Sequence, residues 1–551
     1  MKKTNIFILV SIIIALVIVQ LLVFTGCNKK KYDPNNFIDD TSSGKIVKEK
    51  ITLNFFVPRS QQHLQDWNQM RLFKELEAET NIAIKFSYGD VSSYENQKSS
   101  AWTSRNKPDA FFLWNKVSDQ ITEASLGTII PIDDLLAQYA PNYIALAESD
   151  PEIAKTARLL DGKTYSTVII NTVPRDWTFK QYINVNWIYQ ALINEYLTLN
   201  DLGLDTLPDI ADPSRRNLLL PKTTDEFYKV LKAFKRMGKN PLSSIGYSNN
   251  LRRFLMSAFG FVTTGITLND DKVIFVQNTQ NYREYLKYAN KLFSEGLIDN
   301  SIFTNSSESA FFAKADNLGC FDSSSAYLVV GKDKDSEYTA LPPLTSPINK
   351  QKMWVDYDNK YDATSLMIPT STPYYREIIR WIDRLYSPKY IQLQAFGKES
   401  VDWNWDNPEK TSFTFNVPKG QAIEQFRGTL TPSVGLGQIA YWDGNFVLKE
   451  NNPVTQKINC ESLVYLDYLK KPFPKVKFTS DESKTLAFLT TGLNATSTDF
   501  EKLVITGDKN NDIHNDEVWA RYQSNLSKAG VANYINLNKT AYERYKKINC
   551  D

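Results

Sequence analysis

The 551-residue sequence contains few of the residues on which metal sites and hydrolytic triads depend. It has two histidines, His63 and His514, in separate regions, and four cysteines without a CxxC pair. A zinc site or a Ser-His-Asp triad would depend on one of these two histidines, which argues against both. The sequence also lacks the GxSxG and HExxH motifs of serine hydrolases and zinc peptidases. We therefore expect no metal, no cofactor and no catalytic residues.

An excess of charge of one sign is missing as well. The chain has 64 basic and 62 acidic residues and a net charge of +2. Nucleic-acid binding depends on clustered positive charge, so we expect no nucleic-acid partner. Three widely spaced cysteines lie in the body of the chain, at Cys320, Cys460 and Cys550. They cannot all pair within one molecule, and the sequence leaves open whether any two do.

Long apolar runs are absent except at the N terminus. Residues 6–24 are almost wholly apolar and follow two lysines, which is typical of a secretory signal, although a run of this length could also span a bilayer. The tetrapeptide FTGC, residues 24–27, resembles a bacterial lipoprotein lipobox, with Phe24 in place of the usual leucine. The resemblance implies that residues 1–26 are a lipoprotein signal peptide. Cys27 would then carry diacylglycerol and palmitate and hold the chain on the extracytoplasmic face of the cell membrane.

Residues 27–48 are polar and charged, with almost no apolar periodicity. Such composition is typical of a linker that does not bury enough apolar surface to fold. We therefore expect a flexible tether between the lipid-bearing cysteine and the first ordered domain.

The following segment alternates between strand and helix patterns. Strands are predicted at 51–57, 82–86 and 107–114, with a helical apolar stripe over 67–79. This alternation with short joints predicts an α/β fold with a largely parallel sheet. Ligands of such sheets bind beyond the carboxyl ends of the strands. The residues just after Val57 and Leu113 therefore face the expected site.

Several segments in a fixed order resemble one protein family. They are DWNQMRLFKELEAETNIAIKF (66–86), RNKPDAFFLW (105–114), PKTTDEFYKVLKAFK (221–235), YREYLKYANKLFSEGLID (282–299) and the tail from 518 to 546. Together they are similar to the sugar-type extracellular solute-binding proteins, in the large lipoprotein subgroup of family 1. These proteins are the receptors of bacterial ABC importers. The resemblance covers nearly all of the chain after the signal segment.

The resemblance implies a periplasmic-binding-protein-like fold, in which two α/β lobes joined by a hinge of crossing strands enclose the ligand. By analogy, lobe 1 takes residues 49–172 and 365–425, and lobe 2 takes residues 180–360 and 430–551. The chain would cross between lobes near 169–183 and near 362–367. Many relatives carry a calcium loop after the helix that corresponds to 224–236. Here that loop reads RMGKNPLSSIG (236–246), without a carboxylate, so we expect no calcium there.

A second segment, 508–519, resembles the start of an EF-hand calcium loop. However, Ile513 and Trp519 occupy the positions at which that loop needs glycine and glutamate. We expect a solvated turn.

Aromatic residues are abundant, with 11 Trp, 29 Tyr and 30 Phe. Carbohydrate sites combine flat aromatic faces for the CH surfaces of sugar rings with polar groups for the hydroxyls. Each tryptophan flanked by polar residues has a core-packing alternative, and Trp114 is the first choice because it ends a predicted strand. The ligand-binding candidates are Trp67, Trp114, Asn115, Trp177, Arg59, Arg175, Asp176, Arg253, Trp354 and Trp442.

The expected function is capture of a carbohydrate, an oligosaccharide, by a monomeric lipid-anchored receptor that delivers it to the permease subunits of an ABC importer. Three alternatives stay open. One is a surface glycan-active enzyme, a lyase or glycosidase, which would need a carboxylate pair such as Asp356 and Asp358. Another is a receptor for a peptide or other small solute. The third is a relative repurposed for signalling or adhesion.

Overall fold

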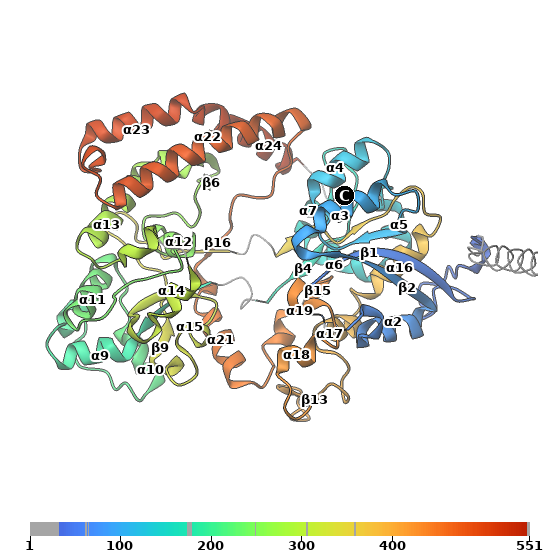
Figure 1. Cartoon of the computed structure of the whole chain (residues 1–551), viewed down its shortest axis with the longest axis horizontal. Helices are drawn as coiled ribbons and strands as arrows, with labels where there is room; N and C mark the ends of the chain where they lie inside the picture. Colours follow the sequence, from blue (N-terminus) through green and yellow to red (C-terminus); the bar gives the residue numbers. More distant parts are fainter. Residues whose placement is uncertain are drawn as a thin grey trace, which may run out of the picture.

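The computed structural model describes residues 32–60, 63, 65–173, 179–247, 249–304, 307–356 and 360–547. These residues form two α/β lobes, which Figure 1 shows side by side. The buried apolar residues form a separate core in each lobe. The core of the N-terminal lobe is made of residues between 37 and 173 and between 363 and 447. The core of the C-terminal lobe is made of residues between 182 and 354 and between 465 and 531. The predicted two-lobe α/β architecture is confirmed.

The N-terminal lobe is built on a four-stranded sheet with the order β12-β3-β1-β2. Strands β1 (Ile51–Arg59), β2 (Ile82–Asp90) and β3 (Ala110–Phe112) run parallel, and β12 (Leu366–Met367) is antiparallel to β3. The apolar run of β1 is buried on both faces because helices cover both sides of the sheet. One side carries α2 (Arg71–Thr80), α5 (Asp133–Tyr139), α6 (Pro141–Ser149) and α16 (Tyr375–Arg384). The other carries α3 (Tyr94–Thr103) and α4 (Val117–Ser125).

The C-terminal lobe is more helical. Its three-stranded sheet has the order β8-β5-β9, from β8 (Cys320–Ser323), β5 (Lys180–Asn184) and β9 (Tyr338–Ala340). Its main helices are α9 (Val185–Ile193), α11 (Thr224–Arg236), α12 (Asn249–Ser257), α13 (Gln280–Ser294), α22 (Ser480–Ile505), α23 (Asp516–Lys528) and α24 (Val531–Lys546). Gly530 separates the last two with a φ of +87°, a left-handed conformation that glycine adopts without strain.

The hinge contains a small sheet of three segments that are far apart in sequence. Strand β4 (Ile169–Asn171) pairs with β11 (Tyr361–Asp362) and with β15 (Tyr441–Trp442). The first crossing, from β4 to β5, lies where it was expected. The second comes earlier than 362–367, since β10 (Trp354–Val355) packs in the C-terminal lobe and β11 already belongs to the hinge sheet.

A third crossing follows residue 447 and corrects the predicted lobe boundary at 425–430. Leu430, Trp442 and Val447 pack in the N-terminal lobe, in one cluster with Val173 and Phe396. The chain enters the C-terminal lobe with α21 (Pro453–Leu463), after which Tyr465 joins that lobe's core. The sequence carries no signal for this crossing because the apolar residues on both sides of it look alike.

The predicted tether is also corrected. Residues 32–48 pack on the N-terminal lobe, with Phe37, Ile46 and Val47 at most 5% exposed and an antiparallel bridge between Phe37 and Val47. The sequence contains no sign of this packing, because only three apolar residues of the segment are buried and they lack helical or strand spacing. The surface of the folded lobe supplies the other side of their apolar contacts. The first part of the predicted tether, residues 27–31, lies outside the described residues.

The predicted signal peptide and Cys27 likewise lie outside the described residues. Within the part of the chain that the structure describes, no helix combines the length and hydrophobicity needed to cross a bilayer. Cys320 is buried and Cys460 is exposed, and both are free thiols. Cys550 lies beyond the last described residue.

Candidate ligand-binding site

The three parallel strands of the N-terminal lobe end at one edge of their sheet. In β1 and β2, Arg59 lies opposite Asp90 at the last paired position. Strand β3 ends at Phe112, and the chain then turns through Leu113 and Trp114. This edge therefore gathers Arg59 and Trp114, two of the residues predicted to bind ligand, from segments more than 50 positions apart.

The turn after β3 has an unusual backbone. Leu113 and Trp114 have φ angles of +71° and +57°, in the left-handed region that residues with a Cβ seldom adopt. Each such residue costs on the order of 1–3 kcal/mol and persists only where the surroundings hold it. Here the Leu113 amide donates to the Ser365 carbonyl at 2.6 Å and the Asn115 amide donates to the Thr364 carbonyl at 2.9 Å. The returning strand thus fixes both sides of Trp114.

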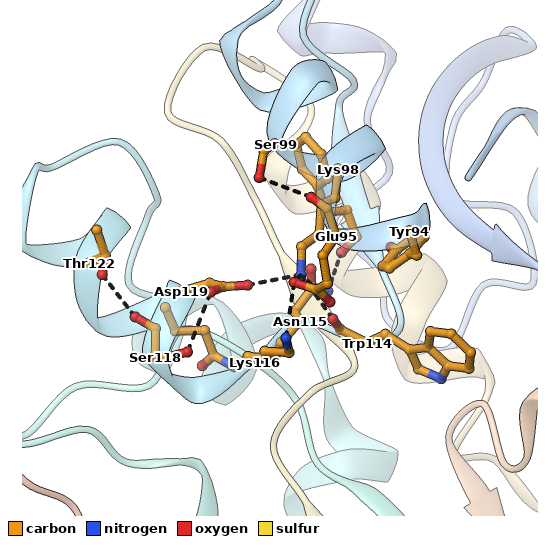
Figure 2. A network of polar contacts seen from close by, with 12 residues as sticks. Tyr94, Glu95, Lys98, Ser99, Trp114, Asn115, Lys116, Ser118, Asp119 and Thr122 are labelled. Carbon is orange, nitrogen blue, oxygen red and sulfur yellow. Dashed lines mark hydrogen bonds and ion pairs between the residues drawn. The ribbon is translucent and has the colours of Figure 1, made fainter. Parts of the chain in front are cut away.

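Helix α3 holds the same turn from the other side. The Tyr94 hydroxyl donates to the Leu113 carbonyl at 3.1 Å, and the Lys98 ammonium donates to the Trp114 carbonyl at 3.0 Å and to Asp119 Oδ2 at 2.8 Å. Lys98 is 6% exposed, and Figure 2 shows it at the centre of this polar network. Burial raises the pKa of Tyr94 far above its ordinary value, so the hydroxyl keeps its proton for donation.

The indole of Trp114 points away from the polar network, as Figure 2 shows. Its ring is half-buried and meets the Tyr94 ring edge to face, with 5.7 Å between ring centroids. A rigidly held aromatic face beside donor groups can pack against the CH surface of a sugar ring. The predicted strand 107–114 is shorter in the structure, at Ala110–Phe112, and Trp114 lies in the turn two residues beyond its end.

Arg59 lies at the same edge in a defined orientation. Its guanidinium is 4.7 Å from the centroid of the Tyr88 ring and 3.2 Å from Asp66 Oδ1. The side chain is 33% exposed. The guanidinium therefore lies over the Tyr88 ring beside Asp66, and its exposed donor groups are of the kind that bind ligand hydroxyls.

Asn115 has a structural role, which corrects its prediction as a ligand contact. It is fully buried, and its side-chain amide donates to the Phe111 carbonyl at 2.9 Å. Gln120 in turn donates to the Asn115 carbonyl at 3.1 Å. The sequence predicted a ligand contact because Asn115 is a polar residue next to Trp114. In the structure its side-chain amide instead stabilises the turn after β3 through the hydrogen bond to Phe111.

Three of the predicted tryptophans are core residues. Trp67 is fully buried, stacks on Phe73 and donates from Nε1 to His63 Nδ1 at 3.1 Å. Trp354 and Trp442 are 3% and 7% exposed and pack in the cores of the C-terminal and N-terminal lobes. Their polar sequence neighbours suggested exposure, but the rings turn inward. In this conformation the three rings offer little surface to a ligand.

The remaining candidates lie elsewhere. Arg253 lines a cavity of about 260 Å³ in the C-terminal lobe, together with Thr263, Thr264 and Phe473. Its neighbour Arg252 pairs with the buried Glu501 at 3.0 Å. Three further predicted site residues, Arg175, Asp176 and Trp177, lie outside the described residues.

Sequence reasoning missed Lys98 and a cavity between the lobes. This junction cavity, of about 330 Å³, is lined by both lobes, with Asp150 and Tyr361 from one and Asp356 and Tyr545 from the other. Several of its polar groups already bind one another: the Tyr545 hydroxyl donates to Glu152 Oε2 at 2.6 Å, and the Tyr361 hydroxyl donates to Asp150. Hydrogen bonds between the residues that line the cavity therefore connect the two lobes. No sequence signal could reveal the cavity, since its residues come from five distant segments.

The two segments considered for calcium bind their own backbone and neighbours. Asp508 and Asp512 accept hydrogen bonds from the amides of Asn510 and His514, both at 3.0 Å. In the loop after α11, Asn240 donates to Asp299, whose carboxylate also contacts the Lys314 ammonium at 2.6 Å. Among the described residues, no three or more acidic, histidine or cysteine side chains gather in a way that would hold a metal ion.

Comparison with known proteins relates the chain to one functional class. No protein-family model matches it. The fructooligosaccharide ABC transporter substrate-binding protein FusA of Streptococcus pneumoniae is 25% identical over 530 residues, 91% of each chain. The structure of FusA in complex with kestose has a TM-score of 0.65 at 23% identity, covering 91% of this chain and 100% of that one. An extracellular solute-binding protein from Bifidobacterium longum subsp. infantis has a TM-score of 0.72 at 18% identity, covering 90% and 99%. The chain is therefore a homologue of ABC transporter substrate-binding proteins and has their two-lobe α/β fold.

Proposed function

We propose that this chain is an extracytoplasmic substrate-binding protein that captures an oligosaccharide and delivers it to the permease subunits of an ABC importer. One observation carries the proposal. A strained turn, held from both sides, presents the half-buried indole of Trp114 at the carboxyl edge of the N-terminal sheet. The chain is also similar over 91% of its length to a protein named for fructooligosaccharide binding.

The chemistry of this edge suits a carbohydrate. An indole face binds the CH surface of a pyranose or furanose ring, and the Arg59 guanidinium offers planar donors to hydroxyl oxygens. Neither group provides the apolar enclosure that a hydrophobic ligand would need. Binding would proceed by closure of the lobes about the three crossings, with ligand favouring the form in which it gains contacts from both lobes.

Two further inferences concern the attachment of the chain to the membrane and whether it catalyses a reaction. We infer from the FTGC segment that Cys27 is lipidated and holds the chain at the membrane surface. We also propose that the chain is a monomer and is not an enzyme, because the relative that it matches over 91% of its length is named as a substrate-binding protein. Of the carboxylate pair considered for catalysis, Asp356 lines the junction cavity and Asp358 lies outside the described residues.

A melting-temperature screen of the chain from Asn28 onward would test this function. Kestose and other oligosaccharides, monosaccharides and short peptides would each be added in excess. A ligand that binds only the folded state stabilises it by about 2.7 kcal/mol at a hundredfold excess over its dissociation constant. We expect an upward shift with one class of oligosaccharide. The Trp114→Ala variant should lose that shift, whereas Phe488→Ala, which alters a side chain 80% exposed on α22, should keep it.

The outcomes separate the alternatives. A shift with peptides alone would overturn the carbohydrate assignment and keep the receptor. Release of smaller sugars during long incubation, followed by chromatography, would establish an enzyme. No shift with any carbohydrate would contradict the proposed function.

A further inference from the structure

The segment that precedes β1 is part of the N-terminal lobe and folds back on itself. The Asn36 side chain donates to the Glu49 carbonyl at 2.9 Å and accepts from the Glu49 amide at 2.7 Å. The Ile46 amide donates to the Thr80 carbonyl, at the end of α2, at 3.0 Å. With the Phe37–Val47 bridge, these bonds make residues 33–49 a closed loop, which we call the N-terminal loop.

Three arginines of α16 clasp the N-terminal loop. Arg376, Arg380 and Arg384 recur every four residues and so lie along one side of the helix. Arg376 donates to the Pro34 carbonyl at 3.4 Å, and Arg380 donates to the Ser43 carbonyl at 3.2 Å. Arg384 donates to the Gly44 carbonyl at 3.4 Å.

The clasp is buried as well as charged. Arg380 is 2% exposed, and the Arg376 guanidinium lies 4.5 Å from the centroid of the Phe37 ring. Hydrogen bonds from a charged donor to a carbonyl contribute more than neutral ones. The N-terminal loop is therefore held to the lobe along most of its length.

The clasp extends to Tyr32, the first described residue. Arg376 Nη2 donates to the Tyr32 hydroxyl at 3.1 Å, and the Tyr32 ring meets the Tyr374 ring edge to face at 5.1 Å. Four residues, 28–31, separate Tyr32 from Cys27. A fully extended chain covers at most about 3.5 Å per residue, so the two lie within about 18 Å of each other.

The next step rests on the proposed lipidation of Cys27. The lipid would hold the surface around Tyr32 close to the bilayer, because the arginine clasp fixes the chain from Tyr32 onward and only residues 28–31 connect it to Cys27. A groove of about 470 Å³ lies at this surface, lined by Tyr32, Arg105, Lys107 and Tyr374 among others. Arg105 and Asn106 are exposed.

The groove is lined by two basic side chains, Arg105 and Lys107, and by one carboxylate, Asp109, which accepts from the Thr372 hydroxyl at 2.9 Å and from the Asn54 amide at 2.8 Å. The basic side chains outnumber the acidic one, and this charge suits an anionic lipid headgroup layer. Arg105 and Lys107 lie beside Tyr32, and the sequence places three consecutive lysines at 29–31. Basic side chains near an anionic leaflet are attracted to its surface. We propose that the surface formed by Tyr32, Arg105, Asn106, Lys107 and Tyr374 rests against anionic phospholipid headgroups. The N-terminal lobe is then fixed at the membrane, and the C-terminal lobe moves relative to it.

Figure 1 agrees with this arrangement. The first described residues, in blue, lie at the end of the N-terminal lobe that points away from the C-terminal lobe. The C-terminal lobe would then be linked to the bilayer through the N-terminal lobe, by the hinge crossings and the contacts at the junction cavity.

Energy transfer from single dye labels to acceptor-labelled headgroups would test the orientation. The full lipidated chain, with Cys460→Ser and Cys550→Ser, would be placed in vesicles of phosphatidylglycerol and phosphatidylethanolamine. Labels would be attached at Asn106→Cys in the N-terminal lobe or at Lys509→Cys, an exposed position in the C-terminal lobe. We expect at least twofold higher transfer efficiency from position 106.

A matched control lengthens the tether. Twenty glycine and serine residues inserted between Lys31 and Tyr32 should remove the difference between the two labels while leaving the melting temperature unchanged. Equal transfer from both positions in the unmodified chain would overturn the orientation. Failure of the chain to float with the vesicles would overturn the lipid anchor and the orientation with it, so the two failures are distinguishable.

Discussion

The Lys98 ammonium binds the carbonyl oxygen of Trp114 at 3.0 Å, and through Asp119 at 2.8 Å it ties α3 to α4 around the same turn. A buried lysine thus sets the position of the aromatic ring that we propose for ligand binding. Because the turn is strained at both Leu113 and Trp114, it needs such contacts to persist.

Replacement of Lys98 by methionine is expected to weaken ligand binding without unfolding the chain. The variant leaves the Trp114 carbonyl and Asp119 without their donor, so the turn should relax and the indole should lose its fixed orientation. We expect about a tenfold higher dissociation constant by calorimetry, equivalent to about 1.4 kcal/mol. Lys116→Met is the control, because its side chain is 60% exposed and its ammonium pairs with Glu95 at 3.3 Å. Equal affinities for the two variants would contradict the role of Lys98.

The His63 ring should make stability depend on pH in the mildly acidic range. Its Nε2 faces the carbonyls of Pro432 and Val434 at 3.0 and 2.8 Å, so Nε2 carries the proton and Nδ1 accepts from Trp67. Burial lowers the pKa of His63 in the folded chain. The unfolded chain then binds more protons below the ordinary value of about 6.5, so stability is present above that pH and is lost as pH falls.

This prediction is checked by denaturant unfolding between pH 5 and pH 8. The His63→Gln variant should have a lower free energy of unfolding than the parent at pH 8. The difference between the two free energies should become smaller toward pH 5. The control is His514→Gln, since His514 is exposed on a turn of the C-terminal lobe. A parallel pH dependence for the parent and His63→Gln would contradict the assignment.

Asp299 should contribute a second pH dependence at lower pH. Burial opposes its ionisation, but the Lys314 ammonium and donors from Ser301 and Asn240 outweigh that effect and hold the pKa of Asp299 well below its usual value. Its contribution is therefore present above the unfolded pKa of about 4 and lost as the pH falls toward the folded value.

The Asp299→Asn variant should unfold at lower denaturant concentration at pH 7, by about 1–3 kcal/mol, and approach the parent near pH 2.5. Asp316→Asn serves as a control, since that carboxylate is 88% exposed and its pair with Lys334 lies at the surface. If Asp299→Asn loses the same free energy of unfolding at every pH, the side chain stabilises the fold by its packing and not by its charge.

Contacts at the junction cavity should influence how the lobes move. The Tyr545 hydroxyl of α24 binds Glu152 of α7 (Pro151–Ala157), and the Lys477 ammonium donates to the Thr156 carbonyl of the same helix at 3.0 Å. Tyr545→Phe removes one bond between the lobes, worth about 0.5–1.5 kcal/mol. Electron-spin distance measurements between labels on the two lobes should show a broader distribution in the unliganded variant. Tyr327→Phe, at a partly exposed position within the C-terminal lobe, should leave the distribution unchanged.

The strands at 51–57 and 82–86 could be predicted because their alternating pattern is local, and they correspond to β1 and β2. Lys98 could not be predicted, because α3 brings it to Trp114 from 16 positions earlier in the chain. The clasp on the N-terminal loop was equally hidden, since it depends on arginines more than 330 positions away.

By itself the sequence determined the alternation of strands and helices, the strand-end position of Trp114 and the order of segments shared with solute-binding proteins. These properties follow from residue spacing, which is local. Only the tertiary structure decided which polar-flanked tryptophans are buried, where the third crossing lies and that residues 32–48 belong to the lobe. Burial of a ring or a loop depends on surfaces contributed by distant segments, and the spacing of neighbouring residues carries no record of those surfaces.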